Sequence, residues 1–206
     1  MTTRFLRTIR TALAIVAVTA PVAALFLACG GGDKNGSCTS SGGADGGVCT
    51  PGVTPAYTSC ADLTTPPVSF ATDIQPIFVG GCTVGGSAGT CHGDPTLDET
   101  TTGQVFLGYP EDAGMTADPA MIIAALVNHK SPENPQMNIV TPSDPGQSYM
   151  MHKLDDDQCQ FASTCNATGN AKFALCGTGM PQLAPILDPD TRDTVRRWIA
   201  QGAQNN

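Results

Sequence analysis

The sequence predicts a mainly helical domain with long, disulfide-stapled loops, preceded by a disordered tether. Three of its Asp-Pro dipeptides precede apolar residues at helical spacing. Asp caps a helix N-terminus and Pro suits the first turn, so each pair marks a helix start. Strand patterns are few. The 206 residues include 23 glycines, 16 prolines and nine cysteines, a composition that indicates a loop-rich domain from an oxidising compartment.

Residues 1–28 have the layout of a secretory signal. Three arginines in the first ten residues precede an apolar run rich in Ala, Val and Leu, as in exported proteins. An uncleaved membrane anchor is the alternative, but the run has only the minimum length for a bilayer span and contains Pro21. The small residue before Cys29 and the glycines after it resemble the lipobox of bacterial lipoproteins. That resemblance implies cleavage before Cys29, lipidation of its thiol, and attachment to a membrane in the periplasm or at the cell surface.

The charge of the chain argues against nucleic acid as a partner. Ten basic residues stand against 18 acidic ones, for a net charge of −8. Removing residues 1–28 takes away three arginines and no acid, which leaves a net charge of −11. Such a chain has no basic patch able to neutralise phosphates. Its acidity instead favours docking on a basic protein surface.

Residues 29–65 are predicted to form the tether, and residues 66–206 the folded domain. The tether is mostly Gly, Ser, Thr and Asp, with too few apolar residues to build a core. The first helix is expected to begin with Asp73 as its N-cap, to hold Pro76 in its first turn, and to end at Gly80. One face of this segment is apolar, formed by Phe70, Ile74, Ile77 and Phe78.

The three Asp-Pro pairs define the remaining helices. Asp118 begins a helix expected to run to about His129, and Asp144 begins one before Tyr149. Asp188 begins the most regular helix, which Gly202 is expected to stop. In that last helix Val195, Trp198 and Ile199 form an apolar stripe, and Asp193 is expected to pair with Arg197 on the polar side. Short strand patterns occur at 104–107 and 138–140.

The segment from Cys82 to Gly93 carries the candidate chemistry. In a c-type haem site two thiols form thioethers with the haem, and the His after the second Cys binds the iron. Cys91-His92 supplies the second half of that pattern. Eight residues separate the two thiols instead of two, but the insert is rich in Gly and Ser and could bulge so that both sulfurs converge. The alternative is a Cys82–Cys91 disulfide with His92 merely exposed.

The order of five motifs over residues 68–204 resembles short cytochrome-c-like domains of secreted bacterial proteins, including the planctomycete type. The motifs are Asp-Ile-x-Pro-Ile-Phe, Cys-His-Gly, a Pro-Gly before a Ser-hydrophobic helix, Met-Pro, and a terminal Trp-Ile-x-x-Gly-Ala; they occur here at 73–78, 91–93, 145–150, 180–181 and 198–203. The resemblance implies that the first and last helices pack together beside a covalently bound haem c. It implies His92 and Met180 as the axial ligands.

Other residues offer competing ligands. The rival methionines are Met115, Met121, Met137, Met150 and Met151. His129 and His152 are expected at helix ends, where a histidine stabilises the helix dipole. The acidic run 155–157 could bind calcium, but we expect a solvated acidic turn.

Cysteine parity leaves the haem question open. Beyond Cys29, eight cysteines remain, enough for four disulfides or for one haem and three disulfides. We expect at least one disulfide among Cys159, Cys165 and Cys176, with the odd one pairing back toward Cys60 or another cysteine of the tether.

The sequence therefore predicts a membrane-anchored electron-transfer module that passes electrons to an unidentified redox partner protein. The alternative is a haem-free, disulfide-stabilised lipoprotein that acts as a binding or structural surface protein. A third reading is a small copper site, because Cys, His and Met are soft ligands. We expect no enzyme, since the sequence has no catalytic triad order, paired-carboxylate motif or phosphate loop.

Overall fold

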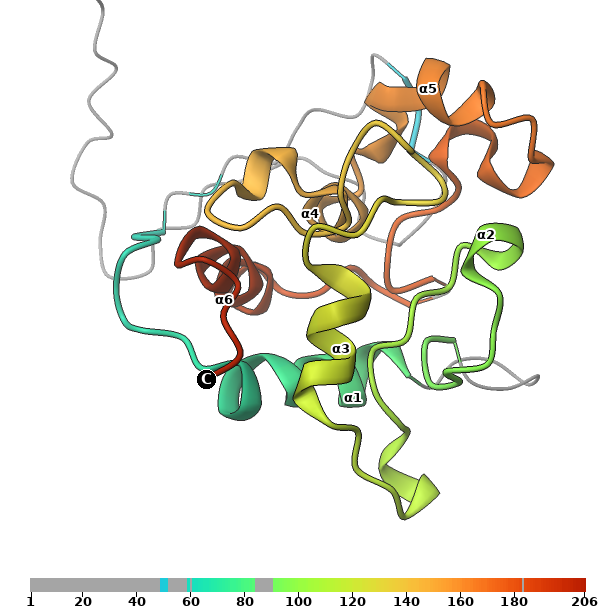
Figure 1. Cartoon of the computed structure of the whole chain (residues 1–206). Helices are drawn as coiled ribbons and strands as arrows, with labels where there is room; N and C mark the ends of the chain where they lie inside the picture. The colour runs from blue at the N-terminus through green and yellow to red at the C-terminus, as the bar shows by residue number, and fades with distance from the viewer. Residues whose placement is uncertain (1–48, 52–58, 60, 84–90, 183) are drawn as a thin grey trace, which may run out of the picture. The chain divides into compact units, whose positions relative to one another are not determined.

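The computed structural model describes residues 49–51, 59, 61–83, 91–182 and 184–206. In these ranges the fold is mainly helical, as predicted, and contains no β-strand (Figure 1). The expected signal at 1–28, Cys29, and most of the tether at 29–65 lie outside the described residues. None of the described helices has the length and apolarity to cross a membrane.

The two segments with strand patterns form no strand. Residues 138–140 make only isolated bridges, such as Val127 with Val140. Residues 104–107 instead lie along the chain at His92, whose carbonyl accepts a hydrogen bond from the Leu107 N–H at 2.9 Å. Each segment forms hydrogen bonds with irregular backbone and not with a second extended strand, so neither becomes part of a β-sheet.

The first helix begins earlier than predicted, and it continues through Gly80 and Gly81 to Cys82 instead of ending at these glycines. A π-helical turn, η1 (Phe70–Ile74), leads into α1 (Gln75–Cys82). The N-cap is Ser69, and the expected Asp73 instead accepts a hydrogen bond from the Ser69 N–H at 2.8 Å. The wide turn sets Pro76 at the start of α1, where the missing proline N–H has no helical partner to lose.

The first of the Asp-Pro helices, α3 (Pro119–Leu126), starts as predicted but stops before His129. The Asp118 side chain caps it by accepting from the Ala120 N–H. The helix ends because the backbone is captured by residues 138–140: the Val140 N–H donates to the Leu126 carbonyl at 3.1 Å, and the Asn128 N–H donates to the Val140 carbonyl at 2.9 Å.

The second Asp-Pro pair produces a shorter structure than expected. Asp144 caps only a 3₁₀ turn, η3 (Pro145–Gln147). The backbone becomes extended at Ser148, and a separate helix, α4 (Tyr149–Asp155), follows. The two elements together keep Tyr149 and Leu154 buried, as the apolar pattern indicated.

The last helix, α6 (Pro189–Ala200), matches its prediction at both ends. Asp188 accepts from the Thr191 N–H, and Gly202, with φ of 103°, follows the last turn. Its apolar stripe is fully buried, and the Trp198 ring lies 5.4 Å from that of Phe70 in η1. The first and last helical segments thus share one hydrophobic core, formed by Phe70, Ile74, Phe78, Val195, Trp198 and Ile199 together with residues of α3 and α4.

Two predictions about charged residues are wrong. Asp193 pairs with Arg196 at 3.4 Å rather than with Arg197, whose guanidinium donates to the Asp62 carbonyl. The acidic run 155–157 is buried instead of solvated. Asp155 accepts from both Arg192 and Arg196 at 3.0 and 2.7 Å, because α4 packs against the polar side of α6.

Disulfides hold the region between α4 and α6. This region contains η4 (Gln158–Phe161), α5 (Ala162–Asn166) and η5 (Ala171–Cys176), and it lies at the opposite end of the domain from α1 (Figure 1). Cys165 pairs with Cys176 inside it, and Cys159 pairs with Cys49 of the tether. Both pairings confirm the expected stapling, and they are compatible with an exported protein.

Candidate functional site

The structure brings Cys82 and His92 together across the insert that separates them in sequence. Cys82 is the last residue of α1, and its carbonyl accepts a hydrogen bond from the His92 N–H at 3.1 Å. Cys82 and Cys91 are both free thiols here, not the disulfide of the alternative reading. Burial, and then the nearby Cys91, raises the pKa of Cys82 to about 12, so this thiol stays protonated at neutral pH.

One hydrogen bond prepares His92 to act as a ligand. Its Nδ1 lies 2.8 Å from the carbonyl oxygen of Val105. A carbonyl oxygen can only accept, so Nδ1 carries the proton and Nε2 carries a lone pair. Burial also lowers the pKa of His92, which keeps the ring neutral. A neutral histidine fixed through a backbone carbonyl is the usual form of a metal-binding imidazole.

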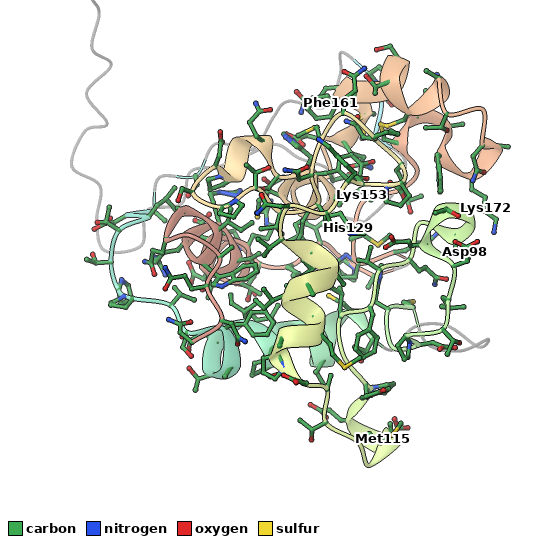
Figure 2. All side chains as sticks on the ribbon, viewed as in Figure 1. Asp98, Met115, His129, Lys153, Phe161 and Lys172 are labelled. Atoms are coloured by element: carbon green, nitrogen blue, oxygen red, sulfur yellow. A yellow bond between two sulfur atoms is a disulfide. The ribbon has the colours of Figure 1, made fainter. Side chains whose placement is uncertain are left out.

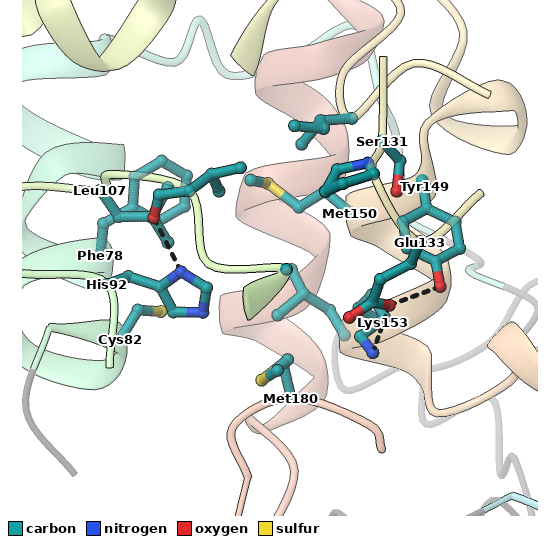
Figure 3. A pocket seen from close by; sticks show the side chains of 15 residues that line it. Phe78, Cys82, His92, Leu107, Ser131, Glu133, Tyr149, Met150, Lys153 and Met180 are labelled. Carbon is teal, nitrogen blue, oxygen red and sulfur yellow. Dashed lines mark hydrogen bonds and ion pairs between the residues drawn. The ribbon is translucent and has the colours of Figure 1, made fainter. Parts of the chain in front are cut away.

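Three of the predicted site residues line one cavity of about 80 Å³: Cys82, His92 and Met180 (Figure 3). The His92 ring and the Met180 side chain extend into the same space from different parts of the chain. Cys91 does not line this cavity. Most of the wall is apolar, formed by Phe78, Val105, Leu107, Ile139, Met150 and Leu154.

Two methionines reach the cavity. Met180 is held there because its N–H donates to the Lys153 carbonyl at 2.7 Å. Met150 approaches from α4. The other rivals lie elsewhere: Met115 and Met121 are exposed, whereas Met137 belongs to a second hydrophobic cluster and Met151 to the main core.

The opposite wall carries a buried ion pair that the sequence reasoning missed. The Lys153 ammonium donates to the Glu133 carboxylate at 2.9 Å, and the Tyr149 hydroxyl donates to the same oxygen at 2.7 Å. The Lys153 ammonium also donates to the Cys176 carbonyl at 2.9 Å. Burial lowers the pKa of Lys153, although Glu133 opposes the shift. Burial and then the Glu133 charge raise the pKa of Tyr149.

The two other histidines have local roles and do not line the cavity. His129 follows α3 and pairs through Nε2 with Glu99 in the short helix α2 (Glu99–Thr102). His152 lies in α4, where its Nδ1 contacts the Asp157 carboxylate at 2.7 Å and its Nε2 the Gly146 carbonyl at 3.1 Å. Burial works against the charged form of His152, but the Asp157 hydrogen bond and charge outweigh it and raise the pKa.

Comparison of the chain with protein-family models, with curated proteins and with solved structures finds no match. Among the described residues, no three of the His, Cys, Asp and Glu side chains are grouped to hold a metal ion. The feature of the chain that could hold a cofactor is the mixed set of imidazole, thiol and thioether groups around this cavity.

That set fits the axial ligands of a haem. An imidazole with a free Nε2 and a thioether sulfur are the His/Met pair of many c-type haems, and the apolar wall suits a macrocycle. Cofactor pockets commonly measure about 300–1,000 Å³, so the cavity of about 80 Å³ must widen to admit a haem group.

Proposed function

We propose that this protein is a membrane-anchored electron-transfer module that carries one covalently bound haem c. The observation that carries the proposal is the convergence of Cys82, His92 and Met180 on one apolar cavity, with the Nε2 lone pair of His92 available. The five motifs in order, and their resemblance to short cytochrome-c-like domains, support the same function.

Each ligand has a defined task in this proposal. His92 would hold the iron of the haem through Nε2, with its ring oriented by the Val105 carbonyl. Met180 would hold it through its thioether sulfur, which favours the ferrous state and would raise the reduction potential. Cys82 and Cys91 would attach the haem covalently, each thiol adding across one vinyl double bond so that its sulfur bonds to one carbon and its hydrogen to the other.

Bound haem supplies a one-electron couple and needs no further substrate chemistry. Apolar side chains that line the cavity, among them Phe78, Leu107 and Leu154, would exclude water from it. With both His92 and Met180 holding the iron, no position on it would stay open for a substrate. We therefore propose an electron carrier rather than an enzyme, acting with an unidentified redox partner protein.

The location proposed for this module is the outer face of a membrane. The segment 1–28 acts as a lipoprotein signal, and Cys29 becomes the lipidated first residue. The segment between Cys29 and Cys49, where the disulfide to Cys159 ties the chain to the domain, then gives the domain its reach from the membrane surface. Disulfides between Cys49 and Cys159 and between Cys165 and Cys176 suit that oxidising compartment.

Expression together with a cytochrome c maturation system tests the proposal. The protein should keep haem after denaturing electrophoresis and should show the sharp absorption band of a reduced c-type haem. His92→Ala should lose that spectrum. Complete absence of covalent haem from the folded wild-type protein contradicts the proposal.

The choice of methionine needs its own pair of variants. Met180→Leu and Met150→Leu remove one thioether each from the same cavity at nearly constant volume. If Met180 is the ligand, only Met180→Leu abolishes the methionine–iron charge-transfer band and lowers the potential. The opposite pattern assigns the ligand to Met150.

The second candidate function is a haem-free surface lipoprotein with the same fold. The observation that favours it is the small volume of the cavity, together with the close packing of Trp198 against Phe70 in the neighbouring core. In that case Cys82 and Cys91 oxidise to a disulfide outside the cell. Alkylation of the exported protein with and without reduction distinguishes the two, because the disulfide becomes alkylatable after reduction whereas the thioethers do not.

A further inference from the structure

A second hollow opens on the surface directly after His92. It has a volume of about 500 Å³, within the range of roughly 300–1,000 Å³ found for ligand sites. It lies between the segment that follows His92 and the loop that precedes α3. The residues that line it are Gly93, Asp94, Pro95, Tyr109, Pro110, Asp112, Ala113 and Met115. We call this hollow the Met115 groove.

The Met115 groove is tied to the cavity by backbone and ring contacts. The Leu107 N–H donates to the His92 carbonyl at 2.9 Å, so the two walls are joined next to the candidate ligand. The Tyr109 ring stands edge-on to Phe106 at 5.1 Å. Gly108 lies so close to α1, at a φ of 130°, that a side chain would crowd Val79. The loop is therefore fixed where it meets the domain.

The groove is lined by apolar side chains and by two carboxylates. Met115 is 57% exposed, the largest value among the large apolar side chains of the described residues, and it lies at the end of the loop that protrudes beyond α3 (Figure 2). Asp94 and Asp112 contribute carboxylates, and the Thr96 hydroxyl lowers the pKa of Asp94. None of the described residues that line the groove is basic.

We propose that the Met115 groove is the docking site for a basic partner protein that presents an apolar side chain flanked by Lys or Arg. This inference rests on the proposed function, because that partner would exchange electrons with the group at His92. The groove begins one residue from His92, so a docked partner lies beside the ligand loop. A second copy of this acidic chain, with its net charge of −8, would be repelled.

A blocked synthetic peptide, Lys-Lys-Leu-Leu-Lys-Lys, serves as the probe because the natural partner is unidentified. The measurement is the shift of amide NMR signals of the full chain on titration at low salt. We expect shifts concentrated at Asp94, Tyr109 and Met115, weakening at high salt. The matched peptide with Glu in place of Lys should not bind.

Two acidic residues give a matched pair of variants. Asp112 and Asp190 are both exposed in the first turn of a helical segment, the 3₁₀ turn η2 (Glu111–Ala113) and the helix α6 respectively, but only Asp112 lines the groove. An exposed ion pair is worth about 0.2–1 kcal/mol, so Asp112→Asn should lower the affinity for the peptide by up to about fivefold. Asp190→Asn should leave the affinity unchanged, and Met115→Ser should also weaken binding.

Three outcomes overturn the docking site: no binding at low salt, shifts spread over exposed acidic residues of the whole chain, or equal effects of Asp112→Asn and Asp190→Asn. Met115-dependent dimerisation in sedimentation would assign the groove to a second copy instead. The peptide assay needs no haem. A chain that binds peptide at the groove but lacks covalent haem therefore refutes the proposed function alone, and a haem-loaded chain with no peptide binding refutes the docking site alone.

Discussion

The buried ion pair of Glu133 and Lys153 is the most demanding residue-scale feature of the cavity. Both residues are at most 9% exposed. The Lys153 ammonium and the Tyr149 hydroxyl donate hydrogen bonds to the same carboxylate oxygen of Glu133. Two charges removed from water are stable only when each keeps its partner. Their position on the cavity wall, opposite His92, fixes charge in an otherwise apolar space.

Removing one member of this pair should therefore cost far more than removing both. Lys153→Met leaves Glu133 buried and unpaired, and should lower the free energy of unfolding by about 3–5 kcal/mol. The double variant Lys153→Met with Glu133→Gln should recover much of that loss. Urea unfolding of the haem-free chain measures both. Equal losses in the single and double variants would show that the pair is not coupled.

His152 should make the stability of the domain depend on pH. Its pKa is raised in the folded state by the Asp157 carboxylate against the effect of burial. The folded chain therefore holds a proton that the unfolded chain releases near pH 6.5. This contribution is fully present below pH 6.5 and is lost as the pH rises through the folded pKa.

The control is His152→Gln, which removes the titrating ring. The wild-type melting temperature should fall as the pH is raised above about 6.5, the unperturbed histidine value, and the variant should lack that part of the fall. The same slope in both proteins would contradict the role given to His152.

At the scale of elements, the Asp-Pro pairs illustrate what local sequence can predict. Asp118 and Asp188 start helices where expected because capping uses only neighbouring residues. The end of α3 was missed because Val140, distant in sequence, takes the carbonyl of Leu126. Ser69 was missed as the N-cap because the chain enters α1 through the π-helical turn η1, which helical spacing alone does not reveal. Within that turn the Asp73 side chain accepts a hydrogen bond from the Ser69 N–H.

The disulfide-stapled elements η4, α5 and η5 should depend on their cross-links to different extents. Cys165 and Cys176 are 11 residues apart, whereas Cys49 and Cys159 are 110 apart. A disulfide stabilises a fold mainly by restricting the unfolded chain. This stabilisation grows with the length of the closed loop, from about 3 kcal/mol for 15 residues to about 4.7 kcal/mol for 100 residues.

Paired Cys→Ser variants test this order. The Cys49/Cys159 variant should lose more unfolding free energy than the Cys165/Cys176 variant in urea denaturation. Both variants should keep the Trp198 core, monitored by its fluorescence. A larger loss for the short loop would show that the elements it closes, rather than the unfolded chain, set the stability.

At the scale of the whole molecule, the sequence predicted the helical, disulfide-stapled fold. His92 and Met180 were named from motif order and Cys82 from its spacing to Cys91. The fold places Cys82, His92 and Met180 on one cavity, but Cys91 does not line it. Glu133 was missed because it lies in a loop with no pattern and meets Lys153 only through tertiary packing. The burial of residues 155–157 was missed because two arginines of α6, also distant in sequence, surround Asp155.

The central claim is that Cys82 and Cys91 are bonded to haem. Addition of a thiol across a vinyl group loses no hydrogen, so the claim predicts an intact mass of the mature protein that is larger by one whole haem, retained after denaturation. A disulfide instead removes two hydrogens and adds nothing. The direct measurement is the intact mass of the protein matured with a haem-attachment system. A gain of one haem, lost when both cysteines are replaced by serine, is the predicted result; a mass reduced only by hydrogens would contradict it.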